Sequence, residues 1–345
     1  MHRLPILLVL MAAAAPTATT LAQNPIALTA RLQDREERRE RQRQSTRETQ
    51  TERHTQTVNI GAEGQLDVFN ISGDVKVTRG GGSSATIEVI KTARASTADE
   101  ARTVLALVTV EIAERSGRAE VRARYPDQEE LRRSGRRNVN VDVAINISAP
   151  QNARVTVKSI SGNVSVSDIT GAVALESVSG SVRVANAGRV SSAKSISGNV
   201  DVINTRVDGA LDAGTISGIV RIQGTTARSL TLGSVSGSVV IEDVTCDRID
   251  AQSISGDVQF SGDFQPNGRY DLKSHSGNVR LSLGTKTGFQ VEATSFSGSV
   301  RTDLPLTLRG SQSGGRQRNL RGTFGDGSAL VELTSFSGSV VIGKR

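Results

Sequence analysis

The chain has 345 residues with 42 Lys or Arg against 35 Asp or Glu, a formal net charge of +7. Its single Cys rules out an internal disulfide, and one Cys with three His is too few for a transition-metal cluster. Aromatic residues make up 3% of the chain and Trp is absent, which argues against the stacking platforms that bind single-stranded nucleic acid. We therefore expect no cofactor, no metal and no nucleic-acid partner.

Residues 1–22 are typical of a secretory signal peptide. A basic start precedes an apolar run over residues 4–15 and small residues at Thr20 and Ala22. The apolar run is too short to span a membrane. The protein is therefore predicted to be exported, to the periplasm or the cell surface, and not to be an integral membrane protein.

Residues 23–57 are predicted to form a charged polar spacer. The stretch 31–53 contains eight Arg and six Asp or Glu and almost no apolar residue. Such a sequence cannot bury a face, so the interpretation is a disordered segment or a solvated helix.

Residues 58–150 are predicted to form an N-terminal cap. Ile87 and Val89 alternate as in a strand, and the segment 96–108 predicts a short helix with Ser96 as N-cap. The alternation over 139–147 returns the chain to strands. A solenoid needs such a cap because an uncovered end strand would pair with other chains.

Residues 151–345 repeat one phrase, first seen in this region as "SISGNV" at 159–164. Its glycines recur at intervals of 18 to 21 residues, apart from one final step of 40 that we interpret as two periods. A drifting period of this length is typical of a solenoid. Counting the copy in the cap, the phrase glycines are Gly73, Gly162, Gly180, Gly198, Gly218, Gly237, Gly256, Gly277, Gly298 and Gly338.

Each coil is predicted to contain two short strands joined at two corners. Val164 and Val166 alternate with Ser165 and Ser167, which is the pattern of a strand with one buried side. Glycine suits the corners because it adopts positive φ without a steric cost, and glycines between the phrases, such as Gly171 and Gly209, are expected at the second corner. The fold class predicted is all-β, a single-chain parallel β-solenoid (β-helix) with coils of about 18–21 residues.

The residue between the two serines of the phrase is mostly apolar, and we expect it to form one internal column. The serines on either side are expected to hydrogen-bond to local backbone and to neighbouring coils. A nucleophilic serine would need a nearby base, usually histidine, and after the start region the chain has only His54 and His275. The column residues are Ile160, Val178, Ile196, Ile216, Val235, Ile254, His275, Phe296 and Phe336.

His275 is the exception in this column, and two interpretations stay open. It is a neutral histidine in the core, hydrogen-bonded to backbone or to a neighbouring serine, or it is a base or a pH switch. The absence of an Asp or Glu from its phrase favours the first.

A Gly- and Arg-rich segment at 309–322 has no periodicity and is predicted to be an exposed basic loop. Its arginines either keep the loop solvated or contact an anion or a partner. These candidate contact residues are Arg309, Arg316, Arg318 and Arg321.

The order of these motifs over residues 58–345 resembles a family of bacterial cell-envelope proteins called "putative adhesins". The resemblance rests on "NISGDVKV" at 70–77, the helix at 96–108, "VDVAINISAP" at 141–150 and the glycine-rich loop before "SFSGSVVIG". It implies a β-solenoid domain of unknown function, related to the heads of autotransporter adhesins, with no catalytic residues to transfer.

Two functions remain open. The first is a non-enzymatic, adhesin-like module whose repetitive surface binds an envelope protein, an anionic polysaccharide or a lipid, with self-association through a solenoid end. The alternative is a polysaccharide lyase or hydrolase on a parallel β-helix, which would need clustered ionisable residues in a groove. The scarcity of such clusters favours the first.

Overall fold

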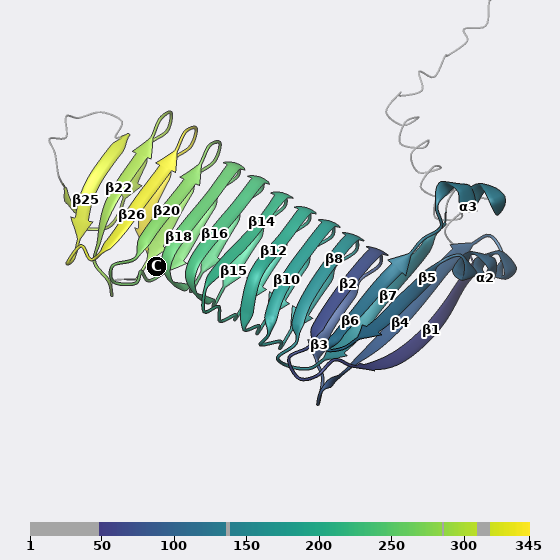
Figure 1. The fold of residues 1–345 in the computed structure, drawn as a ribbon. Helices are drawn as coiled ribbons and strands as arrows, with labels where there is room; N and C mark the ends of the chain where they lie inside the picture. The colour runs from purple at the N-terminus through teal and green to yellow at the C-terminus, as the bar shows by residue number, and fades with distance from the viewer. Residues whose placement is uncertain (1–47, 136–138, 285, 309–317) are drawn as a thin grey trace, which may run out of the picture. The chain divides into compact units, whose positions relative to one another are not determined.

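The computed structural model describes residues 48–135, 139–284, 286–308 and 318–345. In this part of the chain two long β-sheets, of 13 and 14 strands, are built mainly from parallel strands (Figure 1). The predicted all-β parallel solenoid is thereby confirmed. The predicted signal peptide and residues 23–47 lie outside the described residues.

Sheet A contains the shorter strand of each regular coil. Along the sheet its strands are β1 (Glu48–Asn59), β4 (Ser84–Ala95), β7 (Val141–Ala149), β3 (Val75–Arg79), β9 (Val164–Ser167), β11 (Val182–Ala185), β13 (Val200–Ile203), β15 (Val220–Gln223), β17 (Val239–Glu242), β19 (Val258–Gly262), β21 (Val279–Leu283), β27 (Val340–Lys344) and β23 (Val300–Thr302).

Sheet B contains the longer strands. Along the sheet they are β24 (Thr307–Leu308), β25 (Asn319–Phe324), β22 (Phe289–Ser295), β26 (Ala329–Ser335), β20 (Arg269–Ser274), β18 (Thr245–Ser255), β16 (Thr226–Ser236), β14 (Ala210–Ser217), β12 (Arg189–Ser197), β10 (Ala172–Ser179), β8 (Arg154–Ser161), β2 (Gln65–Ser72), β6 (Arg118–Arg124) and β5 (Thr109–Arg115). Two short helices are described, α2 (Ala98–Ala106) and α3 (Gln128–Arg133).

The core lies between the inner faces of the two sheets. In the coil formed by β9 and β10, the fully buried side chains are Val164 and Val166 from sheet A and Val173 and Leu175 from sheet B. Each of them lies beside a buried residue of the next coil, because β9 pairs in parallel with β11 and β10 pairs in parallel with β12. The predicted two-strand coil and its buried alternation are confirmed.

The phrase glycines stack directly on one another at the first corner. A Cβ built on Gly237 would lie 1.9 Å from the carbonyl oxygen of Gly218, and the other phrase glycines give 2.0–2.4 Å to the oxygen below them. Positive φ, the reason we expected for glycine, applies to some of them, such as Gly162 at φ 136°. The requirement common to all is the close approach of one backbone to the next.

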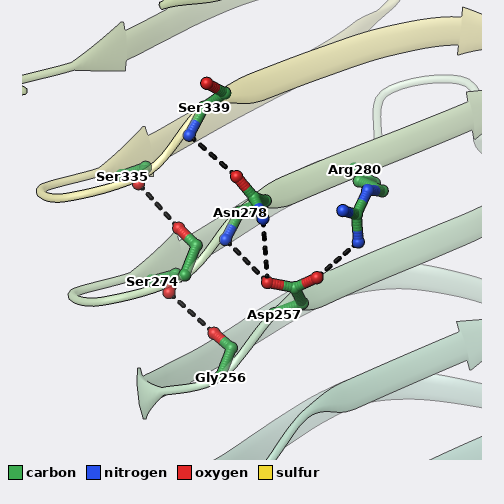
Figure 2. A network of polar contacts seen from close by, with 8 residues as sticks. Gly256, Asp257, Ser274, Asn278, Arg280, Ser335 and Ser339 are labelled. Atoms are coloured by element: carbon green, nitrogen blue, oxygen red, sulfur yellow. Dashed lines mark hydrogen bonds and ion pairs between the residues drawn. The ribbon is translucent and has the colours of Figure 1, made fainter. Parts of the chain in front are cut away.

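A ladder of side chains ties the coils together beside this stack. The backbone N–H of Asn278 donates to Asp257 Oδ1 at 2.8 Å, and the N–H of Ser339 donates to Asn278 Oδ1 at 3.0 Å (Figure 2). Arg280 also pairs with Asp257. Where Asp or Asn follows the phrase glycine, its side chain therefore satisfies a backbone donor of the next coil.

The second corner lies earlier than the sequence analysis placed it. We assigned it to Gly171 and Gly209, but the left-handed residues precede those positions. Asn and Asp tolerate this conformation because their side chains bond locally. The corner residues with positive φ are Asp168, Asn186, Asn204, Gly224 and Asp243.

The start of the described chain corrects two predictions. Residues 48–57, assigned to the spacer, belong to β1, which pairs antiparallel with β4. Backbone pairing forms this strand although its side chains are polar. The helix predicted over 96–108 is α2, but its N-cap is Thr97 and not Ser96, since Thr97 Oγ1 accepts from the N–H of Glu100 at 3.2 Å.

The end of the chain does not follow the order of the coils. Strands β26 and β27, the last in sequence, insert between the coil of β20 and β21 and the coil of β22 and β23 (Figure 1). The final 40-residue step is therefore not two regular periods, as we expected. It contains β24 and β25, which run antiparallel along the outer edge of sheet B.

Gly237 and Gly233 make a matched pair of tests for the glycine stack. Gly237→Ala should cost more than about 3 kcal/mol of unfolding free energy, because a methyl cannot fit against the Gly218 carbonyl. Gly233 has nothing within 4 Å of its Cβ position, so Gly233→Ala should change stability by less than about 1 kcal/mol. Urea unfolding of both variants measures this, and equal costs would contradict the stacking argument.

The fold should lose stability in alkali. Burial raises the pKa of Tyr270 from 10.0 to about 12 and that of Cys246 from 9.0 to about 11. The folded state thus holds these protons more tightly than the unfolded chain, so their contribution is complete below pH 9 and is lost as the pH rises through each folded pKa. Urea midpoints measured from pH 7 to pH 12 should fall above about pH 9, and a flat profile would contradict this.

Candidate functional site

The phrase is oriented opposite to the prediction. Ser195 is 5% exposed and points into the coil, whereas Ile196 is 47% exposed and points away from it. Alternation from the buried Ala193 places Ser195 inside, whereas Val190 precedes a shift of register and has the other phase. The internal column that we expected is therefore wrong, and its residues form an exposed row on sheet B.

We call this row the apolar ladder. It crosses nine successive strands, and its side chains lie on the solvent face one above the other. In spatial order the ladder residues are Ile160, Val178, Ile196, Ile216, Val235, Ile254, His275, Phe336 and Phe296.

The inward hydroxyls have a structural role. Ser195 Oγ donates to the carbonyl of Gly180 at 2.9 Å, and Ser253 Oγ donates to that of Gly237 at 2.8 Å. Figure 2 shows the same bond from Ser274 to Gly256. The predicted hydrogen bonds between coils are confirmed, and a hydroxyl that donates to a carbonyl inside the coil is not placed to attack a substrate.

Ser159 departs from this rule at the start of the row. Its Oγ is buried and has no hydrogen-bond partner among the described residues. The acceptor its position would use is the Gly73 carbonyl, which already accepts from Asn70 Nδ2 at 2.7 Å. Asn70 stands where the other coils carry serine or, at Thr215, threonine, and its longer side chain donates to the carbonyl that Ser159 would otherwise use.

His275 is not in the core. It is exposed, and its ring stacks on Phe336 with centroids 4.8 Å apart and an interplanar angle of 7°. Phe336 stacks in turn on Phe296 at 4.8 Å. The predicted burial of His275 is wrong because this position of the phrase faces outward. The neighbour expected from the sequence order, Phe296, is also wrong, because the last coil inserts between His275 and Phe296.

A groove of about 930 Å³ runs along the ladder. It is lined by the ladder from Ile160 to Phe336 and by the row of residues two positions earlier in each strand, which we call the floor. Two floor positions in the middle, Gly214 and Gly233, carry no side chain. Neither has positive φ, and Gly233 has free space around its Cβ position, so the bare floor is not demanded by the backbone.

The charges that line the groove are paired. Lys158 bonds Glu176 at 3.0 Å, and Lys194 pairs with Asp212 on the next strand. Lys273 bonds Asp271, and this hydrogen bond raises the pKa of the ammonium. Each of the three lysines thus has a carboxylate partner, and the raised pKa of Lys273 is the opposite of what a catalytic base requires.

The four arginines of the predicted basic loop are not brought together in the described residues. Arg309 and Arg316 lie outside them. Arg321 is in β25 and pairs with Glu292, and the carbonyl of Arg318 accepts from the N–H of Ser295. Residues 319–322 are therefore strand and not loop, and an anion contact at these arginines stays a prediction.

The remaining chemistry-bearing groups do not form a second site. Cys246 is buried and its thiol donates to the carbonyl of Arg248. Within the described residues no cluster of three or more His, Cys, Asp or Glu could hold a metal ion, and no helix is long and apolar enough to cross a membrane.

The family model of the toastrack DUF4097 proteins matches residues 83–343. The chain belongs to this family. The resemblance predicted from the order of the motifs is confirmed, and the two parallel sheets built of stacked coils are its toastrack architecture. No curated protein matches the chain.

Solved structures similar to this toastrack chain are distant. A "putative adhesin" from Parabacteroides distasonis is 10% identical with a TM-score of 0.48, over 85% of this chain and 97% of that one. A "putative lipid binding protein" from the same organism is 10% identical with a TM-score of 0.46, over 85% and 96%. A "putative adhesin" from Bacteroides fragilis is 13% identical with a TM-score of 0.43, over 85% and 97%.

Two serines test the inward hydroxyls of this toastrack chain. Ser253→Ala should cost about 1 kcal/mol, because the Gly237 carbonyl loses its donor. Ser159→Ala should be neutral or stabilising by about 1 kcal/mol, because the hydroxyl that is removed is buried without a partner. Chemical unfolding measures both, and a larger cost at Ser159 would contradict the assignment.

Proposed function

We propose that this toastrack chain is a non-enzymatic binding module of the bacterial cell envelope, and that the groove along its apolar ladder holds an elongated hydrocarbon chain. The observation that carries the proposal is a row of eight exposed apolar side chains, with His275 as its one polar member, on nine neighbouring strands. Single exposed apolar residues are common, but a contiguous row on one face indicates a binding surface.

The dimensions of the groove suit a long and narrow ligand. Neighbouring strands in a sheet lie ~4.8 Å apart, so the seven steps from Ile160 to Phe336 span roughly 34 Å. The ladder has one residue from each strand, and Gly214 and Gly233 lie beside its middle. A linear ligand can contact every rung, whereas a compact one would contact only a few.

Backbone pairing favours a hydrocarbon over an extended peptide. The strands that carry the groove, β8 to β26, each have a paired strand on both sides. Their backbone N–H and C=O groups are therefore used within the sheet. A peptide laid across the strands would leave its own amides without partners against an apolar wall, which is costly.

The polar side chains of the groove fit an uncharged ligand body. Its three lysines are neutralised by carboxylates, so the groove presents no strong net field along its length. The same pairing weakens the lyase or hydrolase alternative, because these carboxylates serve as ion-pair partners. Export to the periplasm or the cell surface remains part of the proposal and rests on residues 1–22.

Binding of N-phenyl-1-naphthylamine, an uncharged apolar fluorophore, tests the groove. The full chain should bind the probe, and oleate should displace it. Ile216→Asp places a charge on the exposed ladder without entering the core, so affinity should fall at least about tenfold while the unfolding midpoint stays nearly unchanged.

Ser165→Asp provides the control, since Ser165 faces outward on sheet A, away from the groove. It should bind the probe as the original chain does. Absence of probe binding to the original chain, or equal binding by Ile216→Asp, would remove the proposal.

A further inference from the structure

Strand β1 forms one edge of sheet A. It has 12 residues and pairs with β4 along its whole length. On its other side no strand is paired among the described residues. Natural proteins usually shorten or cover such edges because a free edge can pair with another chain.

Alternate residues of β1 direct their backbone groups to this free edge. The N–H of Ile60, which follows β1, donates to Ser83 at the start of the β4 pairing, and the N–H of Arg94 donates to Asn140 on the far side of β4. In an antiparallel pair the direction alternates residue by residue. The even-numbered residues of β1 therefore bond β4, and the odd-numbered residues 49–57 point outward.

The sequence of β1 is close to a palindrome. Residues 49–57 read "TQTERHTQT", which is symmetric about Arg53 apart from Glu52 and His54. When a strand pairs antiparallel with a second copy of itself, a twofold axis passes through one central position. Each residue then lies opposite the residue of the other copy that is equally far from this position on its other side. Centred on Arg53, the register puts threonine opposite threonine and glutamine opposite glutamine.

The same register satisfies the backbone. It places odd-numbered residues opposite odd-numbered residues, which are the ones with outward N–H and C=O groups. The five outward pairs from Thr49 to Thr57 would form about ten hydrogen bonds. A register shifted by one residue in either copy would oppose odd with even positions and lose them.

We propose that two copies of this chain associate through β1, antiparallel and twofold about Arg53, so that sheet A continues from one copy into the other. A self-complementary patch is what a twofold dimer requires. Glu52 then lies opposite His54 of the second copy, which sets a carboxylate acceptor opposite a ring N–H donor at two positions. The facing Arg53 side chains are each held by Glu88 of their own copy at 3.4 Å.

Cysteine cross-linking tests both the contact and its register. Arg53→Cys faces its own copy across the axis, at the ~5.5 Å Cα separation that a disulfide spans. Mild oxidation of the full chain should therefore give a covalent dimer. The only natural thiol, Cys246, is buried and should not compete.

Thr49→Cys is the matched control on the same strand, because its partner in the proposed register is Thr57. Alone it should not cross-link, but a mixture with Thr57→Cys should. Cross-linking of Thr49→Cys alone as readily as Arg53→Cys would overturn the register.

Thr55→Pro tests the association without cross-links. It removes an outward N–H and leaves the even-numbered bonds to β4 intact, and edge strands accept proline. Light scattering should show the original chain as a dimer and this variant dissociating at least about tenfold more readily, with an unchanged circular dichroism spectrum. A monomeric original chain, or an equally stable Thr55→Pro dimer, would overturn the proposal.

Discussion

The structure depends on the contact between one phrase glycine and the glycine of the next coil. Their backbones approach so closely that a Cβ at Gly277 would lie 2.2 Å from the carbonyl oxygen of Gly256. The contact fixes the corner of each coil over the one before it. The inward serine then supplies a donor to that carbonyl, as Ser274 does at 2.8 Å. Glycine and serine recur together because each solves one part of the same stacking problem.

The exposed ladder is a consequence of this arrangement. Once the serine three residues before the glycine points inward, alternation forces the next residue outward. An apolar residue there is not needed by the core, which is filled by Val164, Val166 and their copies. The ladder side chains are thus exposed to water, which is unfavourable for apolar groups and brings no gain to the core. This is why we assign binding to the ladder.

The sequence predicts the strands of each coil well, but it predicts poorly which residues of the phrase point into the core. Period, two-strand coil and helix α2 follow from local spacing and alternation. Hydrophobicity alone places Ile196 and its equivalents in the core, whereas the alternation of the strand places them outside. In the first coil, counting by twos from Val155 and Val157 puts Ser159 inside and therefore Ile160 outside. The inserted last coil and strand β1 could not be predicted in this way, since both depend on pairing between distant segments that composition does not report.

Thiol accessibility tests the orientation of the phrase most directly. Cysteine at position 196 should react with a water-soluble maleimide in the native protein at nearly the rate of an unfolded control. Cysteine at position 195, directed into the coil, should react only after unfolding. Protection at 196 together with rapid labelling at 195 would contradict the account, because it would return the apolar residues to the core.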